Sequence, residues 1–188
     1  MKLKSKIFIS MGMVFVLFGV AISVALTGMQ GNKNRFENFL QQDLALSQAA
    51  TSLYAQGLQM GQALRNIVMD PTNKAAFKNL DQAAKGFKEH TQTALALAAS
   101  NPADLKVLEQ VAALREQQIP LQNKIVALAS TDQLAAIAAI SQEETPVWRK
   151  IREQLMDFNK AKEAAVEKTK AETVAYSQRM LMITLGLL

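Results

Sequence analysis

An apolar run near the amino terminus, Ile7–Met29, contains 23 residues and no charge. As an α-helix it extends ~34 Å, slightly more than the ~30 Å hydrocarbon core of a bilayer. Lysines precede it within residues 1–6, so the positive-inside rule places that amino end in the cytoplasm. A cleavable secretion signal ending near Ser23-Val24-Ala25 is the alternative, but the run is longer than a typical signal core. We therefore predict an uncleaved transmembrane helix at residues 7–29 and export of the residues after Met29.

A second apolar run, Met180–Leu188, follows Arg179 at the carboxyl end of the sequence. These nine residues cover only about 13 Å as a helix, less than half of a bilayer core. We therefore expect residues 179–188 to be the start of a second transmembrane helix, whose remainder and cytoplasmic continuation lie beyond this sequence.

The formal charge of +5 comes mostly from the two ends of the chain. Between them, 17 basic residues from Lys33 to Lys170 face all 16 acidic ones, so this middle part carries only +1. The only compact group of like charge there is Arg149, Lys150 and Arg152. Without a basic patch or stripe, we expect no nucleic-acid partner.

The residue types also argue against several kinds of chemistry. The chain has no cysteine and one histidine, which excludes disulfides, thiolate zinc and haem attachment, so we expect neither a metal site nor a cofactor. The 8 glycines are scattered and form no phosphate-binding loop, and no Ser-His-acid arrangement is apparent. We therefore predict that this region is not an enzyme.

Between the apolar runs, the hydrophobic spacing predicts helices. The first carries a heptad seam at Phe39, Leu46, Leu53, Met60 and Ile67, and should run without a break to Met69. Asp70-Pro71 then marks a boundary, with Pro71 suited to the first turn of the next helix. That second helix carries apolar residues at three-four spacing from Ala76 to Leu97 and should end near Ser100-Asn101-Pro102.

A third helix begins there and carries a stripe at Val107, Val111, Leu114, Gln118, Leu121, Ile125 and Leu128. Pro120 lies inside it and should kink it, because proline removes one backbone hydrogen bond. Ser130-Thr131-Asp132 precedes a short apolar helix, and Thr145-Pro146 should restart the chain as cap and first residue of the last helix. Four amphipathic helices with short connections predict an all-α, antiparallel up-down four-helix bundle, forming one domain over residues 30–178.

Three places in the chain resemble a known family. The first helix ends in MGQALRNIVMDP, followed shortly by AAFKNLDQA; the last helix begins near EETPVWRK and meets the membrane with AYSQRM. With the apolar anchors, the chain looks like the periplasmic four-helix sensor module of methyl-accepting chemotaxis proteins. Because the same module occurs on histidine kinases and diguanylate cyclases, the resemblance identifies an input and leaves the output open.

The resemblance implies a homodimer that pairs through the first helix, where we assign Phe39, Leu46, Leu53, Gly57 and Met60 to the interface. It further implies a ligand site at the membrane-distal end and a small displacement of the last helix. The family's amino-acid receptors hold the ligand carboxylate with three arginines on the first helix. The matching stretch here has only Arg65, displaced by one position, so an aspartate or serine receptor is not expected.

Polar and aromatic residues at that same distal end are the candidate ligand contacts. They combine guanidinium groups, which bind carboxylates bidentately, with an indole that offers an apolar wall, and so favour a small organic acid. The candidates are Gln62, Arg65 and Asn66 on the first helix and Thr145, Trp148, Arg149 and Arg152 on the last. The structural alternative is that the arginines are solvated helix residues and that Trp148 caps the bundle.

The resulting hypothesis is the input region of a chemotaxis receptor in a bacterial inner membrane. Its sensor domain would lie in the periplasm and read a small solute, either directly or through a solute-binding protein. Two alternatives stay open: the input of a histidine kinase or diguanylate cyclase, and a membrane-anchored structural bundle that binds no small molecule.

Overall fold

The computed structural model describes residues 3–187 of the chain. Met1, Lys2 and Leu188, which belong to the predicted amino end and second apolar run, lie outside the described residues. The described residues are almost entirely helical and contain no strand, as the composition predicts. The elements are α1 Leu3–Asn38, the π-helix η1 Phe39–Leu44, α2 Ala45–Met69, α3 Lys74–Ala98, α4 Pro102–Ala129, α5 Gln133–Ala139, the π-helix η2 Ile140–Glu144, and α6 Thr145–Leu187.

The chain forms two compact units. The first combines its two ends, Met1–Gln41 and Ala165–Leu188, and the second is Gln42–Ala164. The predicted domain, residues 30–178, covers the whole second unit together with parts of the first, such as Tyr176, whose phenol packs on Gly31.

The helix ends follow the predicted breaks, with corrections at Pro71 and at Thr145. α2 ends at Met69, and the Asp70 carboxylate accepts hydrogen bonds from the N–H (2.9 Å) and hydroxyl (2.7 Å) of Thr72. These two bonds, the hydroxyl first, hold the pKa of Asp70 below its ordinary value. Pro71 is not in a helical first turn as predicted, because α3 begins only at Lys74, where Asn73 accepts from the N–H of Ala76 and caps the helix.

The third predicted helix corresponds to α4, which begins at Pro102 with Asn101 as its cap. α4 continues through Pro120 to Ala129. The short apolar helix is α5, capped by Asp132, whose carboxylate accepts from the N–H of Ala135. The predicted ends at Ser100-Asn101-Pro102 and Ser130-Thr131-Asp132 are therefore confirmed.

α6 begins at Thr145, the predicted position, but it continues η2 and is not the predicted capped restart. Thr145 has helical dihedral angles, and its N–H donates to the carbonyl of Ile140, five residues earlier. The helical path consequently continues from α5 through η2 into α6. The wider π-helical turn accommodates Pro146, which lacks the N–H that a regular ladder would use at the next step.

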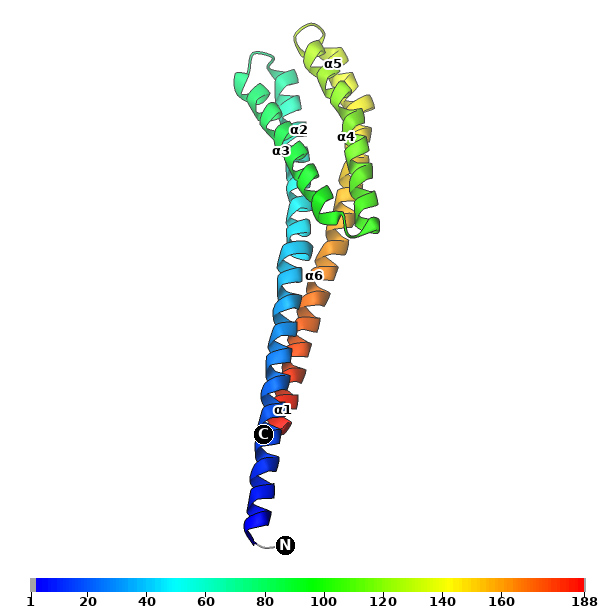
Figure 1. The fold of residues 1–188 in the computed structure, drawn as a ribbon. Coiled ribbons are helices and arrows are strands. Elements are labelled where there is room, and N and C mark those ends of the chain that lie inside the picture. The colour runs from blue at the N-terminus through cyan, green and yellow to red at the C-terminus, as the bar shows by residue number, and fades with distance from the viewer. Residues whose placement is uncertain (1–2, 188) are drawn as a thin grey trace. The chain divides into compact units, whose positions relative to one another are not determined.

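The second unit is a four-helix arrangement, in which α2 runs antiparallel to α3, and α4 antiparallel to the part of α6 before Ala165 (Figure 1). The predicted seam residues Leu46, Leu53, Met60 and Ile67 are all buried. They pack in two clusters, one around Phe87, Val111 and Leu155, the other around Ile125 and Ala136. The antiparallel helical bundle expected from the spacing is thus confirmed.

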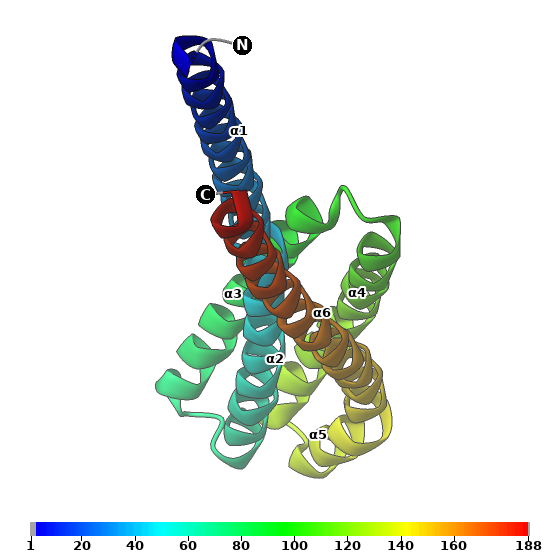
Figure 2. The same ribbon diagram turned by 90° about the horizontal axis from the view of Figure 1, so that it is seen from below.

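The first unit contains one helix long and apolar enough to cross a membrane, covering Lys6–Asn34 with a mean hydropathy of 2.5. The carboxyl-terminal part of α6 lies beside it (Figure 1, Figure 2). Met180 packs on Gly28 and Tyr176 on Gly31, so the two segments run antiparallel. The absence of a Cβ at these glycines lets the α6 side chains reach the backbone of α1.

Candidate functional site in the helical bundle

The predicted ligand residues lie on α2 and α6 of the second unit. Gln62, Arg65 and Asn66 are exposed at the end of α2, and Arg149 and Arg152 are exposed on α6. None of these three arginines forms a hydrogen bond or ion pair with another residue that the structure describes. Thr145, in the first turn of α6, is half-buried. None of the seven residues lines either groove found in the second unit.

Trp148 packs in the core of the second unit. It is only 9% exposed, and its ring stacks on Tyr54 with centroids 6.4 Å apart. The ring occupies the space beside the backbone of Gly57, where a Cβ would come within 2.1 Å of two ring carbons. Gly57 therefore makes room for the indole.

Most of the residues assigned to a dimer interface are buried within the second unit. Leu46, Leu53, Gly57 and Met60 face the core of their own bundle, with Leu53 and Met60 fully buried. Phe39 lies in the first unit, half-buried, with its ring 6.3 Å from that of Phe36. A heptad pattern of apolar residues can pack inside one bundle as well as between two chains. In this chain the seam residues of α2 pack in the core of their own bundle.

A buried polar network on α4 and η2 is the most distinctive group in the second unit. Arg115 Nη1 donates to Oε1 of Gln118 and to Oε1 of Gln122, both at 2.8 Å. Gln118 Nε2 donates to Glu144 Oε1 at 2.6 Å, and Gln122 Nε2 approaches the same oxygen at 3.5 Å. All four side chains are buried. Two amides thus bridge a buried cation and a buried anion.

Burial lowers the pKa of the Arg115 guanidinium, and the carboxylates of Glu144 and Glu116 partly oppose that effect. An arginine starts from so high a pKa that it stays charged at neutral pH. The network therefore holds a positive charge inside the bundle, compensated by the Glu144 carboxylate through the glutamine side chains. A charge is tolerated in such a place only when its surroundings supply hydrogen bonds and a counter-charge.

Arg115 also lies on the wall of a groove between α3 and α4 with a volume of about 790 Å³. Its guanidinium carbon is 5.7 Å from the centroid of the Phe87 ring, a distance suited to a cation–π contact. Apolar residues of both helices complete the wall: Phe77, Leu80, Ala84, Ala112, Ile119 and Val126. The groove combines a concave, partly apolar surface with several charged and amide side chains, and concave, partly apolar surfaces are typical of small-molecule sites.

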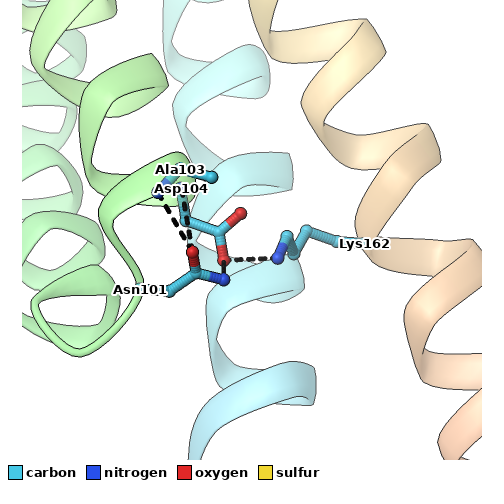
Figure 3. A network of polar contacts seen from close by, with 4 residues as sticks. All are labelled: Asn101, Ala103, Asp104 and Lys162. Atoms are coloured by element: carbon cyan, nitrogen blue, oxygen red, sulfur yellow. Dashed lines mark hydrogen bonds and ion pairs between the residues drawn. The ribbon is translucent and has the colours of Figure 1, made fainter.

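A second polar cluster joins the start of α4 to α6 (Figure 3). Lys162 Nζ forms an ion pair with Oδ2 of Asp104, which also accepts from Nδ2 of Asn101 at 2.7 Å. The side chains of Lys162 and Asp104 are only 11% and 14% exposed. Together, the Glu144 network and the Lys162 pair connect α4 to the α5–η2–α6 helical path at two well-separated levels.

Sequence reasoning missed Arg115 and Gln122 because the predicted stripe of the third helix was only partly correct. The buried positions after Val111 are 115, 118, 122, 125 and 129, whereas the predicted residues Leu114, Leu121 and Leu128 are only half-buried. The available signal was polar side chains at core spacing: an arginine and two glutamines separated by three and four residues.

Among the residues that the structure describes, no group of histidine, cysteine or carboxylate side chains is arranged to hold a metal ion. Comparisons with known protein families, with characterised proteins and with solved structures found no match. The described residues thus form an all-α protein, which combines a helical bundle with one helix able to span a membrane. The bundle contains a groove that is lined by a buried arginine.

Proposed function

We propose that this region senses a solute for a transmembrane receptor of the chemotaxis type, with α1 anchored in the bacterial inner membrane and the bundle in the periplasm. The observation that carries the proposal is the course of α6. Near its start, Ile151 and Leu155 pack in the bundle core, and near its end Tyr176 and Met180 pack on the apolar helix α1. A single helix thus has one part in a bundle that contains a groove of ligand size. Another part of the same helix packs on an apolar helix that is able to span a membrane.

The contacts of α6 within the bundle favour transmission by displacement. A hydrogen-bonded helix moves as a unit more easily than it compresses. Because two polar connections join α4 to the η2–α6 path, a displacement of α6 would carry α4 with it. A solute shifts this equilibrium only through its preference for one arrangement. A tenfold preference corresponds to about 1.4 kcal/mol, which is a modest coupling free energy.

The expected homodimer also remains part of the proposal, but through another face of α2. Because the seam residues are buried, a second copy would contact the exposed side of this helix. That side carries Leu58 and Met69, which are 45% and 76% exposed, together with Gln62 and Arg65. The partners proposed are therefore a second copy of the chain and a periplasmic solute, free or delivered by a solute-binding protein.

Spin labels on the full chain in nanodiscs test the proposal, since the absence of native cysteine makes labelling selective. The variant Phe8→Cys/Met182→Cys places labels on exposed positions of α1 and α6. Amino acids, sugars and organic acids are then added one at a time. A sensor should change the distance between the labels by about 1–2 Å with at least one solute, the usual scale of signalling helix shifts.

The matched control carries both labels on α1, at Phe8→Cys and Met29→Cys. This distance should stay constant, because it reports on one helix only. If no solute, alone or with its binding protein, moves the first pair, the sensing function is refuted and a purely structural bundle remains.

A further inference from the structure

The groove between α3 and α4 offers one unused set of hydrogen-bond donors. Both hydrogen bonds from Arg115 to the glutamines use Nη1, so Nε and Nη2 have no protein partner among the described residues. These two nitrogens are not among the fully buried polar atoms without a partner, so they are not completely sealed from solvent. The rest of the side chain is immobilised, since Arg115 is only 9% exposed.

We infer that this groove binds a small organic carboxylate with an apolar body, and that the free side of the Arg115 guanidinium holds the carboxylate. The inference rests on the proposed sensing function and names the class of solute and its site. A guanidinium edge matches the two oxygens of a carboxylate in a planar, bidentate arrangement. Its fixed position lowers the entropy that binding would otherwise cost.

The remaining walls select the body of the ligand. Leu80, Phe87, Ile119 and Val126 provide apolar surface from both helices, and the volume of about 790 Å³ falls within the usual range of small-molecule sites. The charged residues on the wall are Lys85, Lys88 and Arg115 against Asp81 and Glu116. Because Glu144 compensates Arg115 from outside the groove, the site has no large excess of positive charge, and the free guanidinium edge suits a single carboxylate better than a polyanion.

The same arginine links the groove to the start of α6. Nη1 stays bonded to Gln118 and Gln122, whose amides donate to Glu144, the residue immediately before Thr145. An anion bound to Arg115 would compete with Glu144 for the positive charge of the guanidinium. The buried Glu144 carboxylate would then be less well compensated. The ligand therefore acts on the junction between η2 and α6.

Calorimetry on the full chain in nanodiscs tests the site with benzoate and hexanoate as probes. Benzamide and hexanamide have the same bodies without the charge and should bind at least about tenfold more weakly. Arg115→Gln should weaken carboxylate binding at least about tenfold, whereas Arg149→Gln, exposed and outside the groove, should leave it unchanged. Ala112→Leu narrows the groove while leaving the four network residues in the sequence, and it should also weaken binding, so the test survives an unfolded Arg115→Gln.

Three results would overturn the inference: neither carboxylate binds, the amides bind equally well, or Ala112→Leu and a folded Arg115→Gln retain full affinity. The sensing function is judged separately by the label distances, which respond to solutes of any class. If a carboxylate still changes the label distance in the Arg115→Gln variant, the sensing function stands and the proposed site at Arg115 is refuted.

Discussion

Gly57 and Gly61 lie one helical turn apart on α2, and replacing each by alanine should have opposite effects on stability. In an exposed helix, glycine costs about 0.5–1 kcal/mol relative to alanine, because it loses more backbone entropy on folding. By sequence alone, both substitutions should therefore stabilise the protein. The surroundings of the two Cβ positions decide otherwise.

A Cβ on Gly57 would lie 2.1 Å from two carbons of the Trp148 ring, whereas an ordinary contact begins at 3.4 Å. The ring must therefore retreat by about 1.3 Å, and Tyr54 stacks beside it. Overpacking of this kind costs about 1–3 kcal/mol, which exceeds the gain in helix propensity. We expect Gly57→Ala to lower the free energy of unfolding by about 1–2 kcal/mol.

At Gly61, the nearest atom to an added Cβ is Nη1 of Arg65, at 3.6 Å, which is an ordinary contact. Gly61→Ala should therefore raise the free energy of unfolding by about 0.5–1 kcal/mol. The assay is urea unfolding of the full chain in mild detergent, followed by far-ultraviolet circular dichroism. Trp148 is the only tryptophan, so a shift of its emission in Gly57→Ala reports the displaced ring directly.

A double variant isolates the clash. In Gly57→Ala/Trp148→Phe the smaller ring leaves room for the new methyl group, so the two substitutions should be less destabilising together than the sum of their separate effects. Equal stabilisation by Gly57→Ala and Gly61→Ala, with unchanged tryptophan emission, would refute the packing of Trp148 on Gly57.

Three further predictions concern charged groups. Lys162→Met should lower the free energy of unfolding by about 1–3 kcal/mol, because the carboxylate of its partner, Asp104, is mostly buried. Lys124→Met removes an ion pair that is about half exposed, so it should lower the free energy of unfolding by less than about 1 kcal/mol in the same urea assay. Arg115→Met should cost roughly 3–5 kcal/mol by leaving Glu144 buried without its counter-charge, and adding Glu144→Met should recover part of that loss. The pKa of the Asp70 carboxyl is lowered in the folded state. Its contribution to stability is therefore present above the unfolded-state pKa and is lost as the pH falls through the folded-state pKa. Wild type should melt at a higher temperature than Asp70→Asn near neutral pH, and this difference should disappear in acid.

Each of these predictions has an outcome that contradicts it. Equal losses for Lys162→Met and Lys124→Met would mean that burial of the first pair does not matter. A double variant as unstable as Arg115→Met alone would show that the unpaired Glu144 charge is not the cause. A difference between Asp70→Asn and wild type that persists unchanged in acid would mean that the carboxylate contributes nothing through its charge.

Local patterns were sufficient wherever a property depends on neighbouring residues. The cap at Asn101 followed by Pro102, the cap at Asp132 and the end of α2 at Met69 were all predictable, because capping and helix breaking act within a few residues. Thr145-Pro146 shows the limit of this approach. The pair fits a helix start, but packing and a π-helical turn carry the helix through it.

The candidate site could not be predicted in the same way. A guanidinium on a helix is interpreted as solvated unless its neighbours in space are known, and the counter-charge of Arg115 comes from Glu144, 29 positions later. The same holds for Trp148, which is suited to ligand contact by residue type but in the fold lies against Gly57.

The sequence alone determined the helical class of this protein, the apolar segment able to cross a membrane and most helix ends, because these depend on composition, periodicity and short-range capping. Only the tertiary structure decided which face of each helix is buried, that the seam of α2 serves its own core, and that a charged arginine lies inside the bundle beside a groove. Those properties depend on which residues from distant parts of the chain lie against each other, and a one-dimensional pattern does not contain that information.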